Sequence, residues 1–461
     1  MKMKKVLAIG LSLAMLLGLA ACGSPDSGEP STSGTNTEPA TEVSAPESTP
    51  TEGEEGTDKE ESAASAEDVS LTMWTFPFGT DEQSAEERAN YEAMAAEFEA
   101  STGIHVDVEI IPWGNRETKM LTAIASGEGP DVMYLNPDIL KQFQAYGVLS
   151  PITEYISDET IGAYSESLLD NSVRIGGELY GLPVLVDLGR PVYNLDLVAE
   201  IGMTEDTLPT TWEEYDAMLA ALKDKGIYGV YYNYASSGVS NGAFAQFFSE
   251  GCDVVKEDGT VDVDGEAGRK VLERLASWYQ NGYTPTDSLS IADGDANFMS
   301  GKAASALSST GAGFFVRMAP DITFNWAAGP ILSGDAGQYG ISTVGSLGVS
   351  KSCQNVEAAA RWLEFFTETE RNAQWCYFGG YICPKEDAVS PYQDLKGYGY
   401  ILENLDCVRG EPNHAAARTM NTVFTPDLQA IVSGDVSLDE GIAKMKEDIE
   451  GIVSTVDALR N

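Results

Sequence analysis

Two polar residues follow directly after a short apolar run, and their side chains could bind a polar ligand. The run covers residues 131–135, and Asn136 and Asp138 come before the helix-like pattern of residues 139–144. Carboxylate and amide oxygens accept hydrogen bonds in fixed directions, so Asp138 could accept from a pair of ligand hydroxyl groups. Asp is also favoured at the N-cap of a helix, where it accepts from backbone N–H groups. Both interpretations are open for Asp138, and the same two apply to Asn136.

Another carboxylate, that of Asp187, ends the apolar run of residues 183–186. An unpaired buried charge is costly, so an acid at this position needs a partner. The partner could be a bound ligand, or it could be Arg190, which follows closely in the chain. We favour the ligand.

These polar residues belong to an alternating pattern of strands and helices. The pattern predicts a strand at 69–74, a helix at 86–101, a strand at 104–110, a helix at 116–126 and a strand at 131–135. This order favours an α/β fold with a mostly parallel sheet covered by helices. Ligands of such sheets bind beyond the carboxyl ends of the strands. Trp74 and residues 136–138 lie at two of these ends.

The remainder of the chain continues the mixture of strands and helices. Thr211 followed by Glu214 is typical of a capping box at the start of a helix. The apolar segment 179–192 is interrupted by glycines and prolines, which suits a stretch of chain that must bend. Further helices are expected at 242–249, 268–281, 355–367 and 438–459, and further strands at 228–232 and 304–307.

Length and charge limit the possible classes of protein. A chain of 461 residues exceeds what one hydrophobic core usually serves, so two lobes or domains are expected. The formal net charge of −44 argues against nucleic acid as a partner, because phosphates require clustered Lys and Arg. The same charge disfavours direct electrostatic attraction to anionic lipid and is typical of a soluble, self-repelling surface.

The N-terminus predicts export and lipidation. A basic segment at 1–5 precedes an apolar segment at 6–19 that is too short for a typical membrane span. The sequence LAACG, which ends in Cys22 and Gly23, resembles the bacterial lipobox, in which the Cys is lipidated and becomes the mature N-terminus. We therefore predict a lipoprotein signal peptide at 1–21, with a plain secretory peptide as the alternative. Residues 22–67 would then be the lipidated Cys and a disordered acidic tether, because their composition buries too little apolar surface to fold.

The remaining cysteines and histidines give little support to a metal site or a disulfide framework. Five cysteines remain after Cys22, and an odd number excludes complete pairing. Cys376 and Cys383 could pair, but buried free thiols are at least as plausible. The chain has two histidines and no Cys-x-x-Cys pair, so neither a zinc site nor another metal or cofactor is expected.

Nine segments between Val69 and the C-terminus occur in an order that is typical of one protein family. They are the strand end at Trp74, FEASTGIHVDV, ASGEGPDVMYLNPD, GELYGLPVLVDLGRPVYNLDL, TTWEEYDAML, FMSGKAAS, DITFNWAAGPIL, GSLGVSKS and VSGDVSLDEGIAKM. Together they resemble the extracellular solute-binding proteins of ABC transporters, specifically the sugar-binding family 1 that includes maltose-binding protein.

This resemblance implies a periplasmic-binding-protein-like architecture. Two discontinuous α/β lobes would be joined by a hinge and would close on a ligand in the cleft between them. The first lobe would comprise residues 68–186 and 346–395. The second lobe would comprise residues 187–345 and 396–461.

The resemblance also implies a sugar ligand and places residues around it. Sugars need aromatic platforms for their ring faces and carboxylates or amides for their hydroxyl groups. Trp74 and Asp138 match positions where the family's first lobe contacts sugar, and Asp187 matches a sugar-binding carboxylate beside the hinge. The sequence departs from the family at Gly313, which stands where a platform Trp is common. Phe314 could substitute for that ring, or exposed backbone N–H groups at Gly313 could bind ligand oxygens. Further candidates for ligand contact are Asn136, Asn241, Trp326, Trp375, Tyr381 and Arg418. Among them, Trp326 is more typical of a core residue, and Arg418 could bind an acidic ligand.

These features predict a binding protein at the cell surface rather than an enzyme. The protein would be a monomer, anchored by lipid at the extracellular face of the cytoplasmic membrane, and would deliver an oligosaccharide to the permease of an ABC transporter. A secreted glycoside hydrolase or a binder of a non-sugar solute is the alternative. The sequence contains no nucleophile-elbow, P-loop or HExxH pattern, which weighs against an enzyme.

Overall fold

The computed structural model describes residues 69–114, 116–235, 242–290, 294–307, 311–385, 387–388, 391–392 and 398–460. The predicted signal peptide, Cys22 and the predicted tether lie outside the described residues, and so does the candidate site residue Asn241.

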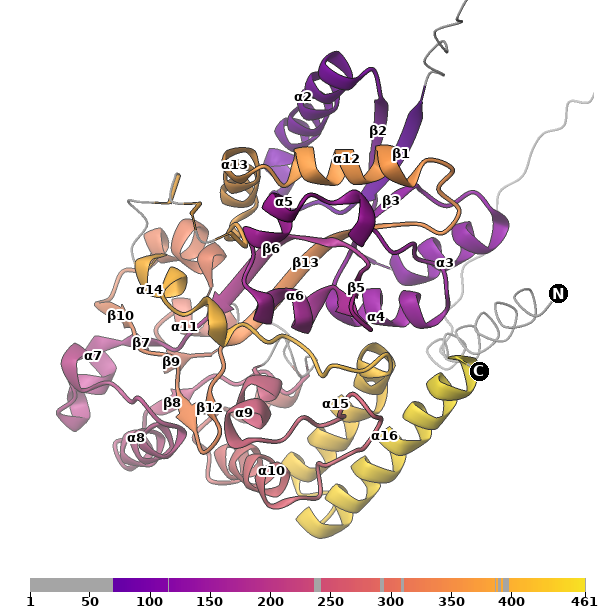
Figure 1. Cartoon of the computed structure of the whole chain (residues 1–461). Helices are drawn as coiled ribbons and strands as arrows, with labels where there is room; N and C mark the ends of the chain where they lie inside the picture. Colours follow the sequence, from indigo (N-terminus) through magenta and orange to yellow (C-terminus); the bar gives the residue numbers. More distant parts are fainter. Residues whose placement is uncertain are drawn as a thin grey trace, which may run out of the picture. The chain divides into compact units, whose positions relative to one another are not determined.

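The first of two main sheets has five strands in the order β2-β1-β3-β13-β6 (Figure 1). These strands are β1 (Ser70–Thr75), β2 (His105–Ile110), β3 (Val132–Leu135), β6 (Leu182–Gly189) and β13 (Ile341–Val349). β1 pairs in parallel with β2 and with β3, whereas β13 runs antiparallel to both of its neighbours. The predicted parallel arrangement is confirmed for the first three strands, and β13 is the strand that departs from it.

Helices cover both faces of this sheet. They include α2 (Ser84–Thr102), α3 (Arg116–Ser126), α4 (Pro137–Ala145), α12 (Val356–Phe366) and α13 (Thr369–Gly379). On one face, the indole Nε1 of Trp362 in α12 donates to the sulfur of Met73 at 3.2 Å. On the other face, Lys119 of α3 lies over the ring of Trp74. Consecutive strand residues point to opposite faces, so Met73 and Trp74 mark the two faces. We call this sheet and its helices the first lobe.

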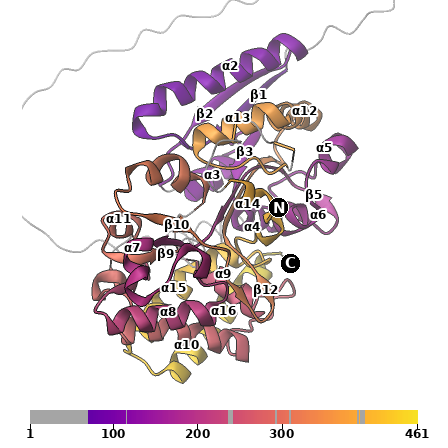
Figure 2. The same cartoon turned by 90° about the vertical axis from the view of Figure 1, so that its left-hand side faces the viewer.

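The second sheet has four strands in the order β10-β7-β9-β8. They are β7 (Val192–Asn194), β8 (Tyr228–Val230), β9 (Ala303–Ala306) and β10 (Trp326–Ala328). Only β8 and β9 pair in parallel. The helices packed with this sheet, which together with it form the second lobe (Figure 2), are α8 (Trp212–Asp224), α9 (Ala243–Glu250), α10 (Glu266–Gln280), α11 (Gly294–Met299), α15 (Ala417–Ser433) and α16 (Leu438–Arg460).

Further short elements of the described chain, besides several 3₁₀ helices, are α5 (Asp158–Gly162), α6 (Glu166–Ser172), β4 (Arg174–Ile175), β5 (Glu178–Leu179), α7 (Leu195–Val198), β11 (Ser333–Gly334), β12 (Gly337–Gln338), the π-helix η6 (Phe314–Met318) and α14 (Tyr398–Leu402).

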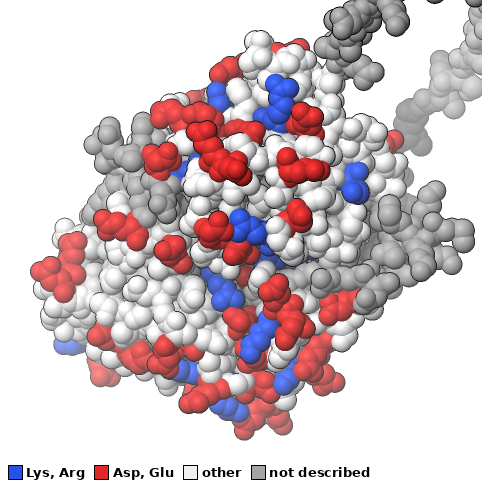
Figure 3. Space-filling model, viewed as in Figure 1, with Lys and Arg blue, Asp and Glu red and all other residues white. Residues whose placement is uncertain are grey.

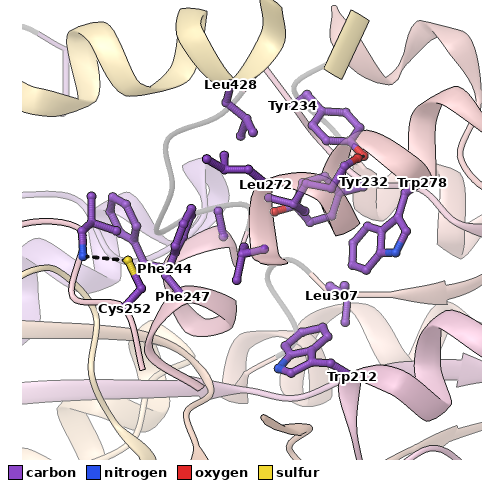
Figure 4. Close-up of a cluster of buried hydrophobic side chains, with 14 of the residues drawn as sticks. Trp212, Tyr232, Tyr234, Phe244, Phe247, Cys252, Leu272, Trp278, Leu307 and Leu428 are labelled. Carbon is purple, nitrogen blue, oxygen red and sulfur yellow. Dashed lines mark hydrogen bonds between the residues drawn. The ribbon is translucent and has the colours of Figure 1, made fainter. Parts of the chain in front are cut away.

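The core of the second lobe is a cluster rich in aromatic side chains (Figure 4). Helix α10 contributes Val271, Leu272, Leu275 and Trp278, all with no exposed surface, which confirms the predicted inward face of this helix. At the start of α8, the side chain of Thr211 accepts from the backbone N–H of Glu214 at 3.1 Å, as predicted. These local patterns therefore position the walls of the second lobe.

Two long strands link the lobes. β6 and β13 pair from Gly189 opposite Ile341 to Leu182 opposite Leu347, with a register irregularity between Gly345 and Ser346. β6 then continues into β7 of the second sheet. The predicted lobe boundaries between residues 186 and 187 and between 345 and 346 fall within these two strands, whereas the third, between 395 and 396, lies outside the described residues. The boundaries themselves stay a prediction.

The five cysteines among the described residues are free thiols, so the possible pairing of Cys376 with Cys383 is wrong. The thiol of Cys376 donates to the carbonyl of Val184 at 3.0 Å, and that of Cys383 donates to Asn372 Oδ1 at 3.2 Å. The described residues contain no cluster of His, Cys, Asp and Glu suited to a metal ion. Among them there is also no helix with the length and apolar character needed to cross a membrane. Acidic side chains are spread over the face shown in Figure 3.

Candidate functional site

Four aromatic side chains meet where β1, β2 and β3 end, and we call them the aromatic cluster: Phe76, Phe78, Trp113 and Tyr134. Phe76 stacks on Trp113 with ring centroids 4.6 Å apart, and Phe78 meets Tyr134 edge-on at 4.9 Å. Trp113 is only half-buried, and its indole N–H donates to the carbonyl of Pro77 at 2.8 Å. Phe76, Phe78 and Tyr134 are buried, so Trp113 supplies the exposed part of the cluster. A partly exposed ring beyond the carboxyl ends of parallel strands is suited to bind the apolar face of a ligand.

Arg116, at the start of α3, lies over the aromatic cluster. Its guanidinium carbon is 4.8 Å from the ring centroid of Trp113 and 5.5 Å from that of Phe76. One guanidinium nitrogen donates to Asn136 Oδ1 at 3.4 Å, whereas the buried Nε has no hydrogen-bond partner among the described residues. A buried N–H group without a partner is costly, so a ligand oxygen at this point would be stabilising.

Asn136 occupies the N-cap position of α4 but does not cap it with its side chain. Its amide nitrogen instead donates to the carbonyl of Val344 in β13 at 3.1 Å. The capping interpretation of Asn136 is therefore wrong for the side chain. The contact ties the end of β3 to one of the two strands that link the lobes.

Asp138 is almost fully buried in the first turn of α4. The helix begins at Pro137, so the interpretation of Asp138 as the N-cap residue is wrong by position. Its Oδ1 nevertheless accepts from the backbone N–H of Ile139 at 2.8 Å, and a negative charge suits a helix N-terminus. Its Oδ2 lies 3.6 Å from a guanidinium nitrogen of Arg418.

Asp187 is paired with backbone N–H groups and not with Arg190, which was the alternative to a ligand. Its Oδ1 accepts from the backbone N–H groups of Ala312 at 2.7 Å and Leu188 at 3.1 Å. Arg190 makes no ion pair with Asp187 among the described residues, and its guanidinium lies 4.2 Å over the ring of Tyr400. The alternative interpretation, an Asp187–Arg190 pair, is therefore wrong.

The carboxyl of Asp187 is held close to the backbone of the second lobe. A Cβ atom at Gly311 would lie 1.8 Å from Asp187 Oδ1, so this approach requires glycine. Burial raises the pKa of Asp187 to about 6, and the hydrogen bonds from Ala312 and Leu188 oppose the shift. Asp187 Oδ2 takes no part in these two hydrogen bonds.

The predicted platforms at residues 313–314 and at Trp326 are packed together. Gly313 precedes η6, and Phe314 exposes 2% of its surface. The rings of Phe314 and Trp326 meet edge-on at 5.6 Å. Phe314 therefore has no free face in this conformation, whereas Trp326 is half-buried.

The other aromatic candidates divide between two places. Phe78 of the aromatic cluster contacts Trp375 at 5.1 Å and Tyr381 at 5.8 Å, so these two predicted residues lie beside the cluster. Trp74 lies under Lys119 Nζ, which is 4.5 Å from its ring centroid. Trp375 and Tyr381 thus contact the aromatic cluster directly. Asn136 is connected to it indirectly, because it accepts a hydrogen bond from Arg116, which lies over the cluster.

Hollows lie beside α13. One of about 610 Å³ is lined by Thr80, Tyr377 and Val316, and another of about 520 Å³ is lined by Met94 and Trp375. Both share Gln374 and Phe378 as lining residues.

Sequence reasoning missed Phe76, Phe78, Trp113 and Arg116. The alternation of aromatics in Trp74-Thr75-Phe76-Pro77-Phe78, directly after a predicted strand, was the signal available for the first two. Arg116 stood inside a correctly predicted helix, and nothing local indicated that it covers an aromatic surface.

Comparison with known proteins decides the family. The sequence model of bacterial extracellular solute-binding proteins matches residues 82–373. The chain belongs to this family. The predicted family and its two-lobe α/β fold are therefore confirmed.

Individual relatives are more distant. A binding protein of Brucella abortus is 26% identical over 355 residues, which are 74% of this chain and 83% of the relative. The maltotriose-binding protein of Pyrococcus abyssi is 29% identical over 127 residues, 27% of each chain. The structure of the sugar-binding protein MalE from Xanthomonas citri superposes with a TM-score of 0.72 at 24% identity, over 84% of this chain and 98% of that one.

Proposed function

We propose that the protein binds an oligosaccharide in a cleft between its lobes and delivers it to the permease of an ABC transporter. Lipid on Cys22 would anchor it at the extracellular face of the cytoplasmic membrane, with residues 22–67 as the tether. The lobe boundaries predicted at 186/187 and 345/346 and the monomeric state are part of this proposal, and the protein would not be an enzyme.

The observation that supports it most is the aromatic cluster with Arg116 above it. Trp113, the half-buried ring of the cluster, offers apolar surface to a ligand, and the buried Nε of Arg116 has no partner in the described part of the chain. A sugar presents C–H bonds on its ring face and oxygens on its rim, so one ligand can satisfy both. Asp187 Oδ2, in the segment joining the lobes, could accept from a sugar hydroxyl group.

The relatives support the same class of ligand. The maltotriose-binding protein of Pyrococcus abyssi and the sugar-binding protein MalE of Xanthomonas citri are named for sugars. Their similarity to this chain is low, so the identity and length of the sugar are not transferred. Neutral gluco-oligosaccharides are the first ligands to test.

A thermal-shift panel tests the proposal. The purified mature chain is heated with glucose, maltotriose, maltotetraose, cellotetraose and xylotetraose, and hits are measured by calorimetry. A ligand at 100 times its dissociation constant should stabilise the protein by about 2.7 kcal/mol. The proposal fails if no carbohydrate of a wider panel binds while an amino acid or peptide does.

Substitutions then locate the site. Trp113→Ala, Asp187→Ala and Trp74→Ala should weaken binding of the best sugar, whereas Tyr155→Ala, which removes an exposed ring from another surface, should not. Unchanged affinity in the first three variants would refute this location. Recovered sugar is also analysed by mass spectrometry, and cleavage products would favour a glycoside hydrolase instead.

The anchor is tested separately. Cells that express the full chain are labelled with a clickable palmitate analogue, with Cys22→Ser as the control. Label on the wild-type protein alone, in the membrane fraction, is the expected result. Label on neither protein would leave the plain secretory alternative.

A further inference from the structure

Helix α15 of the second lobe packs against α4 of the first lobe. α15 belongs to the second lobe because Met420 and Phe424 are part of its core. At the far end of α4, Ala145 also packs against that core. Between these helices the amide nitrogen of Gln142 donates to Thr419 Oγ1 at 3.4 Å. The two lobes therefore contact each other directly here, through both apolar and polar side chains.

Arg418 provides the charged part of this contact. Its Nε lies 3.3 Å from Glu117 Oε2 in α3, and its second guanidinium nitrogen lies 3.6 Å from Asp138 Oδ2 in α4. One residue of the second lobe thus pairs with two carboxylates of the first lobe. A rotation of the lobes that separates α15 from α3 and α4 would lengthen these distances, whereas ion pairs within a lobe would be unaffected.

The surroundings make these ion pairs stronger than ordinary surface pairs. The side chain of Asp138 is 6% exposed, that of Glu117 is 29% exposed and that of Arg418 is 36% exposed. Charges removed from water are screened less, and loss of one partner leaves the other uncompensated. If Arg418 moved away, Asp138 would lose this ion pair and keep the electrostatic attraction of Arg116 and Lys141.

A third carboxyl group, that of Glu411, also interacts with Arg418. Glu411 is 8% exposed, and its Oε2 has no hydrogen-bond partner among the described residues. Burial raises the pKa of Glu411 to about 8 and Asp138 adds to the shift, while Lys141 and Arg418 oppose it. Glu411 attracts Arg418 less strongly than Asp138 and Glu117 do, so these two carboxylates carry most of the interaction.

We propose that Arg418 is a latch between the lobes, which fastens α15 to α3 and α4 and so favours the closed arrangement. This role rests on the proposed function, and it replaces direct ligand contact as the role of Arg418. Affinity for a ligand that needs the closed form scales with the fraction of closed protein. The latch therefore strengthens sugar binding through the lobe equilibrium.

The test uses the full mature chain with three variants and one control. The variants are Arg418→Gln, Glu117→Gln and the double variant. The control, Arg174→Gln, removes an arginine that is 2.7 Å from Asp170 within the first lobe. Small-angle scattering of the ligand-free proteins measures their extension, and calorimetry with maltotetraose, or with the best sugar of the panel, measures affinity.

We expect both single variants to be more extended than wild type without sugar and to coincide with it at saturating sugar. Each should weaken affinity about fivefold, and the double variant should be no weaker than Arg418→Gln. Arg174→Gln should behave as wild type. Overlapping ligand-free scattering curves for wild type and Arg418→Gln would overturn the latch.

Two further outcomes are informative. Strong loss of affinity in Arg418→Gln with none in Glu117→Gln would overturn the latch in favour of direct ligand contact. If no sugar binds the wild-type protein, the proposed function fails, but the ligand-free scattering still decides whether the ion pairs hold the lobes together.

Discussion

The aromatic cluster of the first lobe and the aromatic core of the second lobe are built alike but differ in one arginine. In the second lobe, Arg274 lies over the ring of Trp212 at 5.6 Å, much as Arg116 lies over Trp113. Arg274, however, is 2.6 Å from Glu250 and 3.0 Å from Asp216, so carboxylates neutralise it. Among the described residues Arg116 makes no ion pair. An arginine on an aromatic ring therefore indicates a binding surface only where its donors are left without acidic partners.

The largest expected effect is the loss of stability when a ring of the second-lobe core is removed. Trp278 of the second-lobe core is fully buried, and its indole N–H donates to Asp216 at 2.7 Å. Trp278→Ala should lower the free energy of unfolding by about 4 kcal/mol, because it leaves a cavity and an unpaired acceptor. Urea denaturation measures this, with Tyr155→Ala as the exposed control. A loss below about 1 kcal/mol would mean that this core is not the main source of stability in the second lobe.

Removing the neutralised arginine should also cost stability. Arg274→Met leaves Glu250, whose side chain has no exposed surface, without this partner, although Lys270 still lies 2.7 Å away. We expect a loss of about 3 kcal/mol in urea denaturation, with sugar affinity unchanged in the folded protein. An affinity loss without a stability loss would contradict the assignment of Arg274 to structure.

The matching substitution in the first lobe, at Arg116, should lower sugar affinity and leave stability nearly unchanged. Arg116→Met keeps an apolar side chain over Trp113 but removes the hydrogen-bond donors, so the free energy of unfolding should change by less than about 1 kcal/mol. Affinity for the best sugar should fall about tenfold, which corresponds to the loss of one hydrogen bond to a charged group. Arg361→Met, an exposed arginine on α12, is the control. Equal affinities for Arg116→Met and Arg361→Met would remove Arg116 from the site.

The smallest effect concerns Asp187. Burial raises the pKa of Asp187 to about 6, above the usual value of about 4 for Asp, so the folded protein binds more protons than the unfolded chain between these two pH values. The stabilisation associated with that proton is complete below about pH 4 and is lost as pH rises through 6. Asp187→Asn should therefore gain roughly one or two degrees in melting temperature relative to wild type on going from pH 4 to pH 7.5. A constant difference between the two proteins would show that the carboxyl is solvated.

Local patterns in the sequence predicted the elements well but not their partners. Helical spacing placed α3 at Arg116–Ser126 and the inward face of α10 correctly, because periodicity depends on near neighbours. Asp187 was assigned Arg190 as an alternative partner because that residue is close in sequence, yet its hydrogen bond reaches Ala312, far along the chain. Phe314 was expected to be a platform from the family pattern, and only the packing against Trp326 shows that it is buried. Partners that come together through the fold leave no periodic signal.

Gly345 lies at the irregularity in β13, and a methyl group there would be 2.0 Å from the hydroxyl of Tyr134. A ring of the aromatic cluster thus rests directly on the backbone of a strand that runs between the lobes. If that strand bends at Gly345, the Tyr134 ring must shift with it, and the neighbouring rings must readjust. The packing of the aromatic cluster is therefore coupled to the bend of the strand that joins the two halves of the protein.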